Sequence, residues 1–280
     1  MTGGFHGAID EYVESRPSPA LRPLVASYSG YRSAGVPPAK HRGLPSPYLT
    51  MIITLDDPLV MAAHADPRIP PGEYDSLIGG LHSTPALIVH DGRQSGIQLN
   101  LTPLGARALL RLPAGELANI DVHAEEVLGP FARVLRERVG SASGWRERFA
   151  ALDQALLRHA LLELALPGEV SWAWQRLLTA GGGVSVSDVA GEVGWSTRHL
   201  SQRFRSEIGL GLKEAARVVR FDRARRMLRL PGRPGLAEVA ATCGYCDQSH
   251  LTREFGLLAG LPPARWLVEE TAPVPVAVDL

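Results

Sequence analysis

The chain has 280 residues with 29 Lys and Arg against 29 Asp and Glu, so its formal net charge is zero, and 45% of its residues are hydrophobic. This length allows two domains with separate cores. No apolar run reaches the roughly 18 residues that a membrane helix needs, and no charged-then-apolar signal segment begins the chain. We therefore expect a cytoplasmic protein with no membrane partner.

The zero net charge hides a basic segment. Residues 198–233 contain eleven Lys or Arg and three acidic residues, whereas residues 1–183 contain sixteen basic and eighteen acidic residues. A local excess of positive charge is typical of a surface that binds nucleic acid. The charge pattern therefore separates a near-neutral N-terminal part from a basic C-terminal part.

The N-terminal part is predicted to be rich in short strands. Residues 1–22 are expected to form an arm, because their prolines oppose a long helix. Strands are predicted at residues 24–32, 49–55, 77–81, 86–90 and 96–101, with Pro-rich loops at 33–47 and 65–72. The last two strands flank Asp91-Gly92, which favours a hairpin. Short strands of this kind indicate a small β-barrel or sandwich.

Helical periodicity follows the strands. Thr102 and Pro103 are expected to open a helix that ends near residue 111, and further helices are predicted at 131–139 and 145–166. The helix at 145–166 is apolar on two sides, so it is expected to pack on its own domain and to form a homodimer. A fully intramolecular core is the alternative.

One helical unit occurs twice between residues 185 and 267. Each copy has a short first helix, a turn at Gly194 or Gly244, and a second helix whose N-cap is Ser196 or Asp247. This order predicts two helix-turn-helix units, each offering its second helix to a DNA major groove.

The second helix of each unit is predicted to be amphipathic. Leu200 and Phe204, like Leu251 and Phe255, lie four residues apart on a face that we expect to be buried. The opposite face carries side chains of the types that read DNA bases, namely Arg198, Ser201, Gln202 and Arg205 in the first copy and Gln248, Ser249, Thr252 and Arg253 in the second. The alternative is a helical repeat whose polar faces are only solvated.

A linking helix is predicted between the two units, from about residue 212 to residue 228. At 1.5 Å per residue it is roughly 25 Å long, which suits reading helices about one DNA turn (~34 Å) apart. Its Arg225 and Arg226 are expected to contact phosphates, while other arginines brace the two units.

The segments GWSTRHLSQRF, VVRFDRARRML and CGYCDQSHLTREF, followed by GLPPARW, resemble the DNA-binding domain of the AraC/XylS family of bacterial transcription regulators. The resemblance covers roughly the last hundred residues. It implies a double helix-turn-helix domain on promoter DNA, with RNA polymerase as a further partner and a separate sensing or dimerising domain. By position, it assigns base reading to all of the residues named above on the two polar faces except Arg205.

The predicted fold class is therefore α+β, with three parts. Residues 1–168 form an N-terminal β-barrel or sandwich-like sensor and dimerisation domain with helices. Residues 169–270 form the AraC-type all-α DNA-binding domain, with Gly181 to Gly183 as the joint before the repeat. Residues 271–280 form a flexible tail.

The predicted function is sequence-specific transcription regulation under the control of a small-molecule effector. Tyr28, Tyr48, His82 and Gln98, on or beside the strands, are candidate ligand-binding residues, although Gln98 is equally well placed on a solvated face. Alternatives are a regulator without an effector and a cupin-like metal enzyme fused to a DNA-binding domain. No catalytic residue, cofactor or metal is expected, because the histidines lack metal-ligand spacing.

Cys243 and Cys246 form a C-x-x-C pair. Cys243 aligns with a core position of the first copy, and Cys246 is one extra residue in the second turn. Without a second ligand pair nearby, a buried side chain and a turn residue are favoured over half a zinc site or a redox pair.

Overall fold

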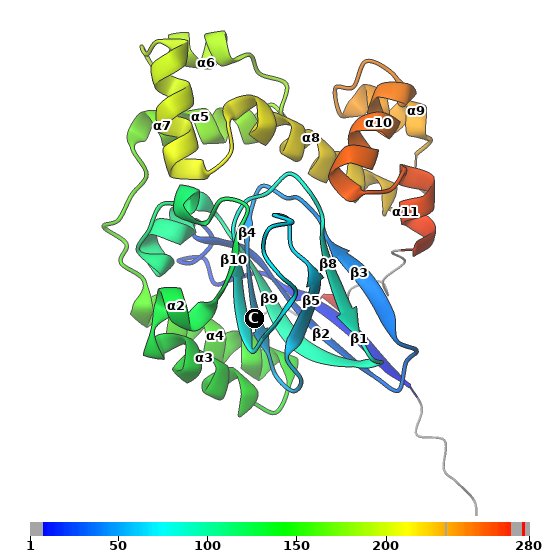
Figure 1. Ribbon diagram of the computed structural model, residues 1–280. Coiled ribbons are helices and arrows are strands. Elements are labelled where there is room, and N and C mark those ends of the chain that lie inside the picture. The colour runs from blue at the N-terminus through cyan, green and yellow to red at the C-terminus, as the bar shows by residue number, and fades with distance from the viewer. Residues whose placement is uncertain (1–7, 233, 270–275, 278–280) are drawn as a thin grey trace, which may run out of the picture.

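The N-terminal part of the chain forms two β-sheets, in a computed structural model that describes residues 8–232, 234–269 and 276–277 (Figure 1). The larger sheet has the strand order β10 (Asp121–His123), β7 (Ser76–Gly79), β4 (Leu49–Thr54), β9 (Arg93–Leu101), β2 (Val25–Ala34), β1 (Ile9–Ser15) and β11 (Val276–Ala277). The smaller sheet has the order β3 (Ala39–Gly43), β8 (Ala86–His90), β5 (Leu59–Ala63) and β6 (Gly72–Tyr74). All pairs are antiparallel except β1 with β11.

The larger sheet is covered on both faces. One face packs on helices through Tyr28, Met51 and Phe149, and the other contributes Ile52 and Leu77 to a core shared with the smaller sheet. The alternation of side chains along β4 produces this division, since Met51 and Ile52 point to opposite faces. The N-terminal domain is therefore sandwich-like, with two open sheets in place of the closed barrel that was the other expectation.

The N-terminal part also contains helices and helical turns. They are α1 (Pro103–Gly105), the π-helical turn η1 (Ala106–Leu110), the 3₁₀ turn η2 (Ala114–Leu117), α2 (Ala124–Leu128), α3 (Pro130–Gly140) and α4 (Trp145–His159). Thr102 caps α1, because its hydroxyl accepts a hydrogen bond from the Gly105 amide at 3.0 Å. The predicted start of this segment is confirmed, but it continues as a π-helical turn.

The C-terminal part, from Gly168 to Glu269, is helical. It contains α5 (Gly168–Thr179), α6 (Val186–Glu192), α7 (Thr197–Ile208), α8 (Leu212–Leu228), α9 (Leu236–Thr242), α10 (Gln248–Ala259) and α11 (Pro263–Glu269). These helices lie above the sheets in Figure 1, with α8 running between the two helix-turn-helix units. The predicted fold class, with a β-rich domain before an all-α domain, is confirmed. No described helix is both long enough and apolar enough to cross a membrane.

Several local predictions are wrong. The chain at Asp91-Gly92 does not close a hairpin, since β8 pairs with β3 and β5 while β9 pairs with β2 and β4. This link carries the chain from one sheet to the other. The supposed arm contains β1, the supposed loops contain β3 and the start of β6, and β5 and β10 were not predicted.

Two further predictions need adjustment. The helix expected at 145–166 ends at His159, and Leu156 is 2% exposed in the core of its own domain. The glycine run is a packed turn, because a Cβ on Gly182 would lie 2.3 Å from the Ala216 carbonyl oxygen of α8. The predicted tail at 271–280 lies outside the described residues, apart from β11.

Candidate DNA-binding surface

Two copies of one short unit build this surface, α6 with α7 and α9 with α10. Gly194 and Gly244 have φ values of 71° and 76°, a left-handed conformation that glycine adopts without strain. The Ser196 hydroxyl accepts the His199 amide hydrogen at 3.2 Å, and the Asp247 carboxylate accepts the amide hydrogen at the matching position of α10 at 2.7 Å. The predicted turns and N-caps are therefore confirmed.

The buried faces of α7 and α10 match the prediction. Leu200, Phe204, Leu251 and Phe255 are all fully buried. The Phe255 ring packs between Phe221 of α8 and Trp266 of α11, with ring centroids 4.9 and 5.3 Å away. These contacts fix which face of each second helix is left to solvent.

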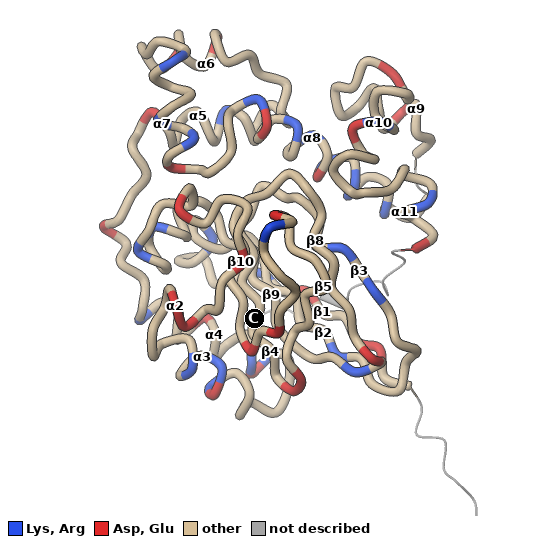
Figure 2. The backbone as a smooth tube through the Cα atoms, in the orientation of Figure 1, with Lys and Arg blue, Asp and Glu red and all other residues tan. Residues whose placement is uncertain are grey.

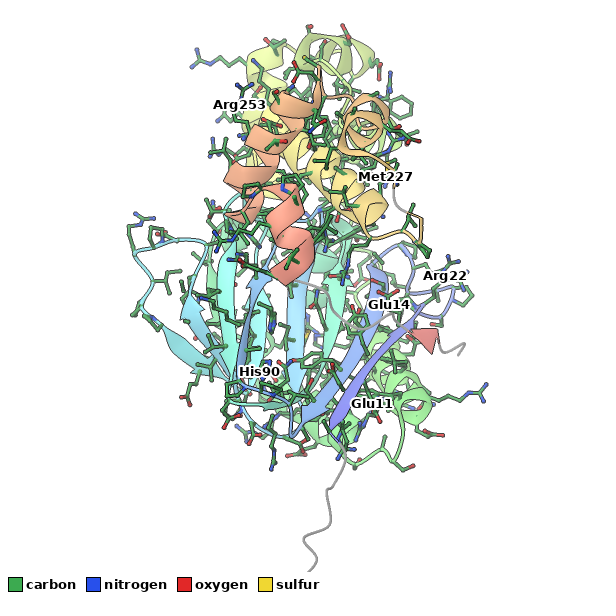
Figure 3. The ribbon with its side chains drawn as sticks, turned by 90° about the vertical axis from the view of Figure 1, so that its right-hand side faces the viewer. Glu11, Glu14, Arg22, His90, Met227 and Arg253 are labelled. Atoms are coloured by element: carbon green, nitrogen blue, oxygen red, sulfur yellow. The ribbon has the colours of Figure 1, made fainter. Side chains whose placement is uncertain are left out.

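The opposite faces of α7 and α10 are open. Seven of the eight residues predicted to read DNA on these helices are exposed, and Thr252 is half-buried. Arg198, Arg205 and Arg253 form no ion pair within the described part of the chain. Figure 3 places Arg253 on the outer side of the C-terminal domain, away from Met227 and from the sheets below. These guanidinium groups are therefore available to an anionic partner.

Other arginines are used inside the protein. Figure 2 shows basic positions along α8. Arg217 and Arg220 of α8 pair with Glu254 of α10, at 2.7 and 3.7 Å, and Arg220 also donates to the Gly182 carbonyl at 3.3 Å. These contacts brace α10 and the turn before α6 against α8, which is the structural role expected for part of this basic segment.

Arg225 and Arg226 have a protein partner in Asp222. Asp222 is 2% exposed, and its two carboxylate oxygens lie 2.7 and 2.6 Å from these guanidinium groups. Burial raises the pKa of Tyr48, and the charges of Arg226 and Asp222 act on the same phenol. This end of α8 therefore lies near the N-terminal domain. Phosphate contact by the two arginines stays a prediction.

The candidate ligand residues of the N-terminal domain do not come together. Tyr28 is buried in the core, where its hydroxyl donates to Asp153 at 2.6 Å, and its pKa is raised by burial and by this bond. Gln98 donates to the Asn100 side chain at 3.1 Å. His82 lies 2.6 Å from the Thr84 carbonyl oxygen, and burial lowers its pKa.

A cavity of about 480 Å³ lies elsewhere, lined by residues of both sheets. Its polar lining includes Tyr31, Glu73 and His90, and also Asp57 and Arg93, which form an ion pair of 2.7 Å. None of the four predicted ligand residues lines it. These side chains carry no sequence signal as a group, because only the stacking of the two sheets brings them together.

A buried polar network that no sequence pattern predicted also lies between the sheets. The Tyr74 hydroxyl lies 3.3 Å from His64 Nε2, and His64 Nδ1 lies 2.7 Å from the Asp121 carboxylate. These hydrogen bonds connect β6 to β10, so we assign the network of Tyr74, His64 and Asp121 a structural role. Within the described residues, no group of three or more His, Cys, Asp or Glu side chains is arranged to hold a metal ion.

The two cysteines differ. Cys243 is buried, with its Sγ 3.5 Å from Met227 Sδ of α8, whereas Cys246 is exposed in the turn. Burial raises the pKa of the Cys243 thiol. The interpretation of Cys243 as a core side chain is confirmed.

Both parts of the chain match known protein families. Residues 189–268 match the family described as a helix-turn-helix domain, and residues 13–123 match a family described as a domain of unknown function. A curated protein of Streptomyces lividans, described as an AraC-like transcription regulator, is 33% identical over 133 residues. The match spans 48% of this chain and only 38% of that relative.

Solved structures share the whole arrangement. ToxT from Vibrio cholerae is 12% identical with a TM-score of 0.52, over 87% of this chain and 98% of ToxT. Wild-type ToxT bound to an unsaturated fatty acid is 11% identical with a TM-score of 0.50, over 99% of this chain and all of that structure. At these identities the likeness concerns the fold.

The fold and the two open helix faces define a two-domain protein with a double helix-turn-helix domain. This C-terminal domain belongs to the AraC type, so the resemblance drawn from the sequence is confirmed.

Proposed function

We propose that the chain is a sequence-specific DNA-binding regulator of transcription, with α7 and α10 entering successive major grooves. The observation that carries the proposal is the repetition of one open polar face on two helices. Its arginines Arg198, Arg205 and Arg253 are paired with no acidic side chain of the described residues. Arginine, glutamine, serine and threonine are the side chains that pair with base edges.

The spacing of the two units supports the same function. The 17 residues of α8 span roughly 26 Å, and the packed units at each end extend this toward the ~34 Å between successive major grooves. Arg198, Ser201, Gln202 and Arg205 belong to one half-site, and Gln248, Ser249, Thr252 and Arg253 to the other. Residues 169–270 are the DNA-binding domain in this proposal, and residues 1–168 are the sensor.

Selection of genomic DNA fragments by the full chain tests this function. A regulator enriches a small set of fragments that share two short half-sites, and its affinity falls steeply as salt rises because phosphate contacts release counterions. Enrichment of all fragments alike, at every salt concentration, would contradict the proposal.

We further infer that a small-molecule effector binds in the cavity between the sheets. Its volume lies in the range of small-ligand sites. The lining includes Asp57, Glu73, Asp91 and one arginine, Arg93, so it suits a polar neutral or basic molecule better than a fatty carboxylate. The fatty acid belongs to ToxT, and its chemistry is not carried over.

Ligand binding can be tested by unfolding temperature with fractionated cell metabolites. An effector that binds the folded state raises the unfolding midpoint in proportion to the logarithm of its concentration. Glu73→Gln should remove the shift caused by a basic ligand while leaving the apo midpoint within about 1 °C. If no fraction shifts the midpoint of the wild type, the effector-independent alternative is favoured.

A homodimer through α4 stays a prediction, as does contact with RNA polymerase. Leu157 of α4 and Val134 of the neighbouring α3 are each 40% exposed, which supports an outer apolar face. Leu157→Asp is the suitable test, because the buried Leu156 would report on folding instead. We expect sedimentation to show a dimer for the wild type and a monomer for the variant, and a dimer in both would exclude this helix.

A further inference from the structure

The N-terminal domain contacts the C-terminal end of α7, the first of the two helices proposed to read DNA bases (the reading helices α7 and α10). Arg107 of η1 donates two hydrogen bonds to one carboxylate oxygen of Glu207 in α7, at 2.8 Å from Nε and 2.6 Å from the terminal nitrogen. The Glu207 side chain is 6% exposed and that of Arg107 is 25% exposed. A charge-assisted pair with one buried partner therefore joins the two domains.

The backbones of η2 and α7 also approach each other closely beside this ion pair. A Cβ on Gly115 of η2 would lie only 2.2 Å from the Ser206 carbonyl oxygen. Any larger residue at position 115 would push η2 away from α7. The contact is thus a fitted interface that includes the last turn of a reading helix.

The N-terminal side of the contact is anchored in the domain core. In η1, the four residues other than Arg107 are buried in the domain core. The Ala108 carbonyl oxygen accepts a hydrogen bond from the Leu161 amide at 2.9 Å, in the segment that connects the domains. A π-helical turn is rare and often marks a functional site. Here it directs one charged side chain out of the core toward α7.

The reading face of α7 stays open while this contact is made. Arg198, Gln202 and Arg205 are exposed although Glu207 is covered. The N-terminal domain therefore holds the end of α7 and leaves these side chains accessible. A contact that positions α7 for DNA must leave these side chains exposed, as this one does. A contact that blocked DNA binding would cover them.

The second unit is held differently. Arg42 of β3 pairs with Glu269 of α11 at 3.2 Å, and Glu269, 30% exposed, also pairs with Arg265 of its own helix. This ion pair is more open to solvent than the one at Glu207 and is made with α11. At the end of α10 itself the approach is looser, since a Cβ on Gly260 would lie 3.4 Å from Pro85 and 4.0 Å from Arg42 Nε. The two units therefore depend on the N-terminal domain to different degrees.

We propose that Arg107 is a positioning residue for DNA recognition, acting through Glu207 to fix the orientation of α7. The proposal rests on the function proposed above. A fixed α7 loses less orientational freedom when it enters the groove, so the intact pair strengthens specific binding. Its loss should affect the half-site read by α7 and spare the half-site read by α10.

The test is sequence selection and affinity with the full chain, comparing the wild type with Arg107→Gln and with the charge exchange Arg107→Glu plus Glu207→Arg. Arg198→Ala identifies the α7 half-site, and Arg253→Ala identifies the other. Arg107→Gln should weaken specific binding about five- to tenfold and flatten base preference in the α7 half-site only. The charge exchange should restore part of both, because an arginine at position 207 would also face Arg203, whose guanidinium lies 3.9 Å from the Glu207 carboxylate. Arg42→Gln should leave the α7 half-site unchanged.

Three results would overturn the proposal. They are unchanged affinity and preference in Arg107→Gln, tighter binding by that variant, and equal loss at both half-sites without recovery in the charge exchange. The first makes the pair irrelevant to DNA, the second makes it inhibitory, and the third makes it a general stabiliser. Absence of selective binding by the wild type would instead overturn the proposed function, and this inference with it.

Discussion

Glu254 connects the linking helix to the second reading helix, and its neutralisation gives a prediction with a defined magnitude. In Glu254→Gln the amide replaces a carboxylate that accepts a hydrogen bond from Arg217 at 2.7 Å and lies 3.7 Å from Arg220. A charge-assisted hydrogen bond contributes roughly 1.5–3 kcal/mol. Because the Arg217 side chain is 35% exposed, solvent screening lowers the expected loss to about 1–2 kcal/mol.

Urea unfolding followed by tryptophan fluorescence measures this loss, with Glu192→Gln as the matched control. Glu192 pairs with Arg176 at 3.3 Å and accepts a hydrogen bond from the Trp172 indole at 3.1 Å. All three side chains are solvent-accessible, at 33%, 42% and, for Trp172, 54%, so the change should cost less than about 0.5 kcal/mol, read from the midpoint and not from the fluorescence amplitude. Equal midpoint shifts for the two variants would refute the view that Glu254 braces α10 against α8. So would a Glu254→Gln midpoint identical to that of the wild type.

Two further predictions concern salt and pH. Replacing Arg225 and Arg226 together by Ala should lower the unfolding midpoint, because it leaves the buried Asp222 unpaired. It should also lower the slope of log affinity against log salt by roughly two, one for each lost phosphate contact, and an unchanged slope would exclude both arginines from the phosphate contacts. Burial and the charge of His90 lower the pKa of His41 from 6.5 to about 4. Between pH 6.5 and about 4 the unfolded chain therefore binds a proton at His41 that the folded chain excludes. The stability that depends on neutral His41 is complete above pH 6.5 and is lost as the pH falls toward 4. His41→Gln should flatten the pH profile of the unfolding midpoint in this window, and an unchanged profile would contradict the assignment.

The helical domain was largely predictable because its signals are local. Capping residues, glycine turns and an apolar spacing of four residues define each unit within about 20 residues, and the predicted bounds of the linking helix agree with α8. The polar faces of α7 and α10 follow from the same periodicity. A repeat of the pattern along the chain then indicates a DNA-binding architecture without any distant contact.

The β domain was less predictable because strand pairing is not local. Asp91-Gly92 has hairpin residues, yet which strands pair is decided by segments tens of residues away. The Arg107–Glu207 contact joins positions 100 residues apart, and the cavity requires two stacked sheets. Neither leaves a pattern in the sequence beyond the residue types themselves.

The central claim, that α7 and α10 each read one half-site, is tested most directly by sequence selection with Arg198→Ala and Arg253→Ala in the full chain. Each variant should lose base preference in a different half-site, with centres about one DNA turn apart, and weaken specific binding by about 1–3 kcal/mol. Non-specific binding should change less. Wild-type preference retained in both variants, or loss in the same half-site, would contradict the claim.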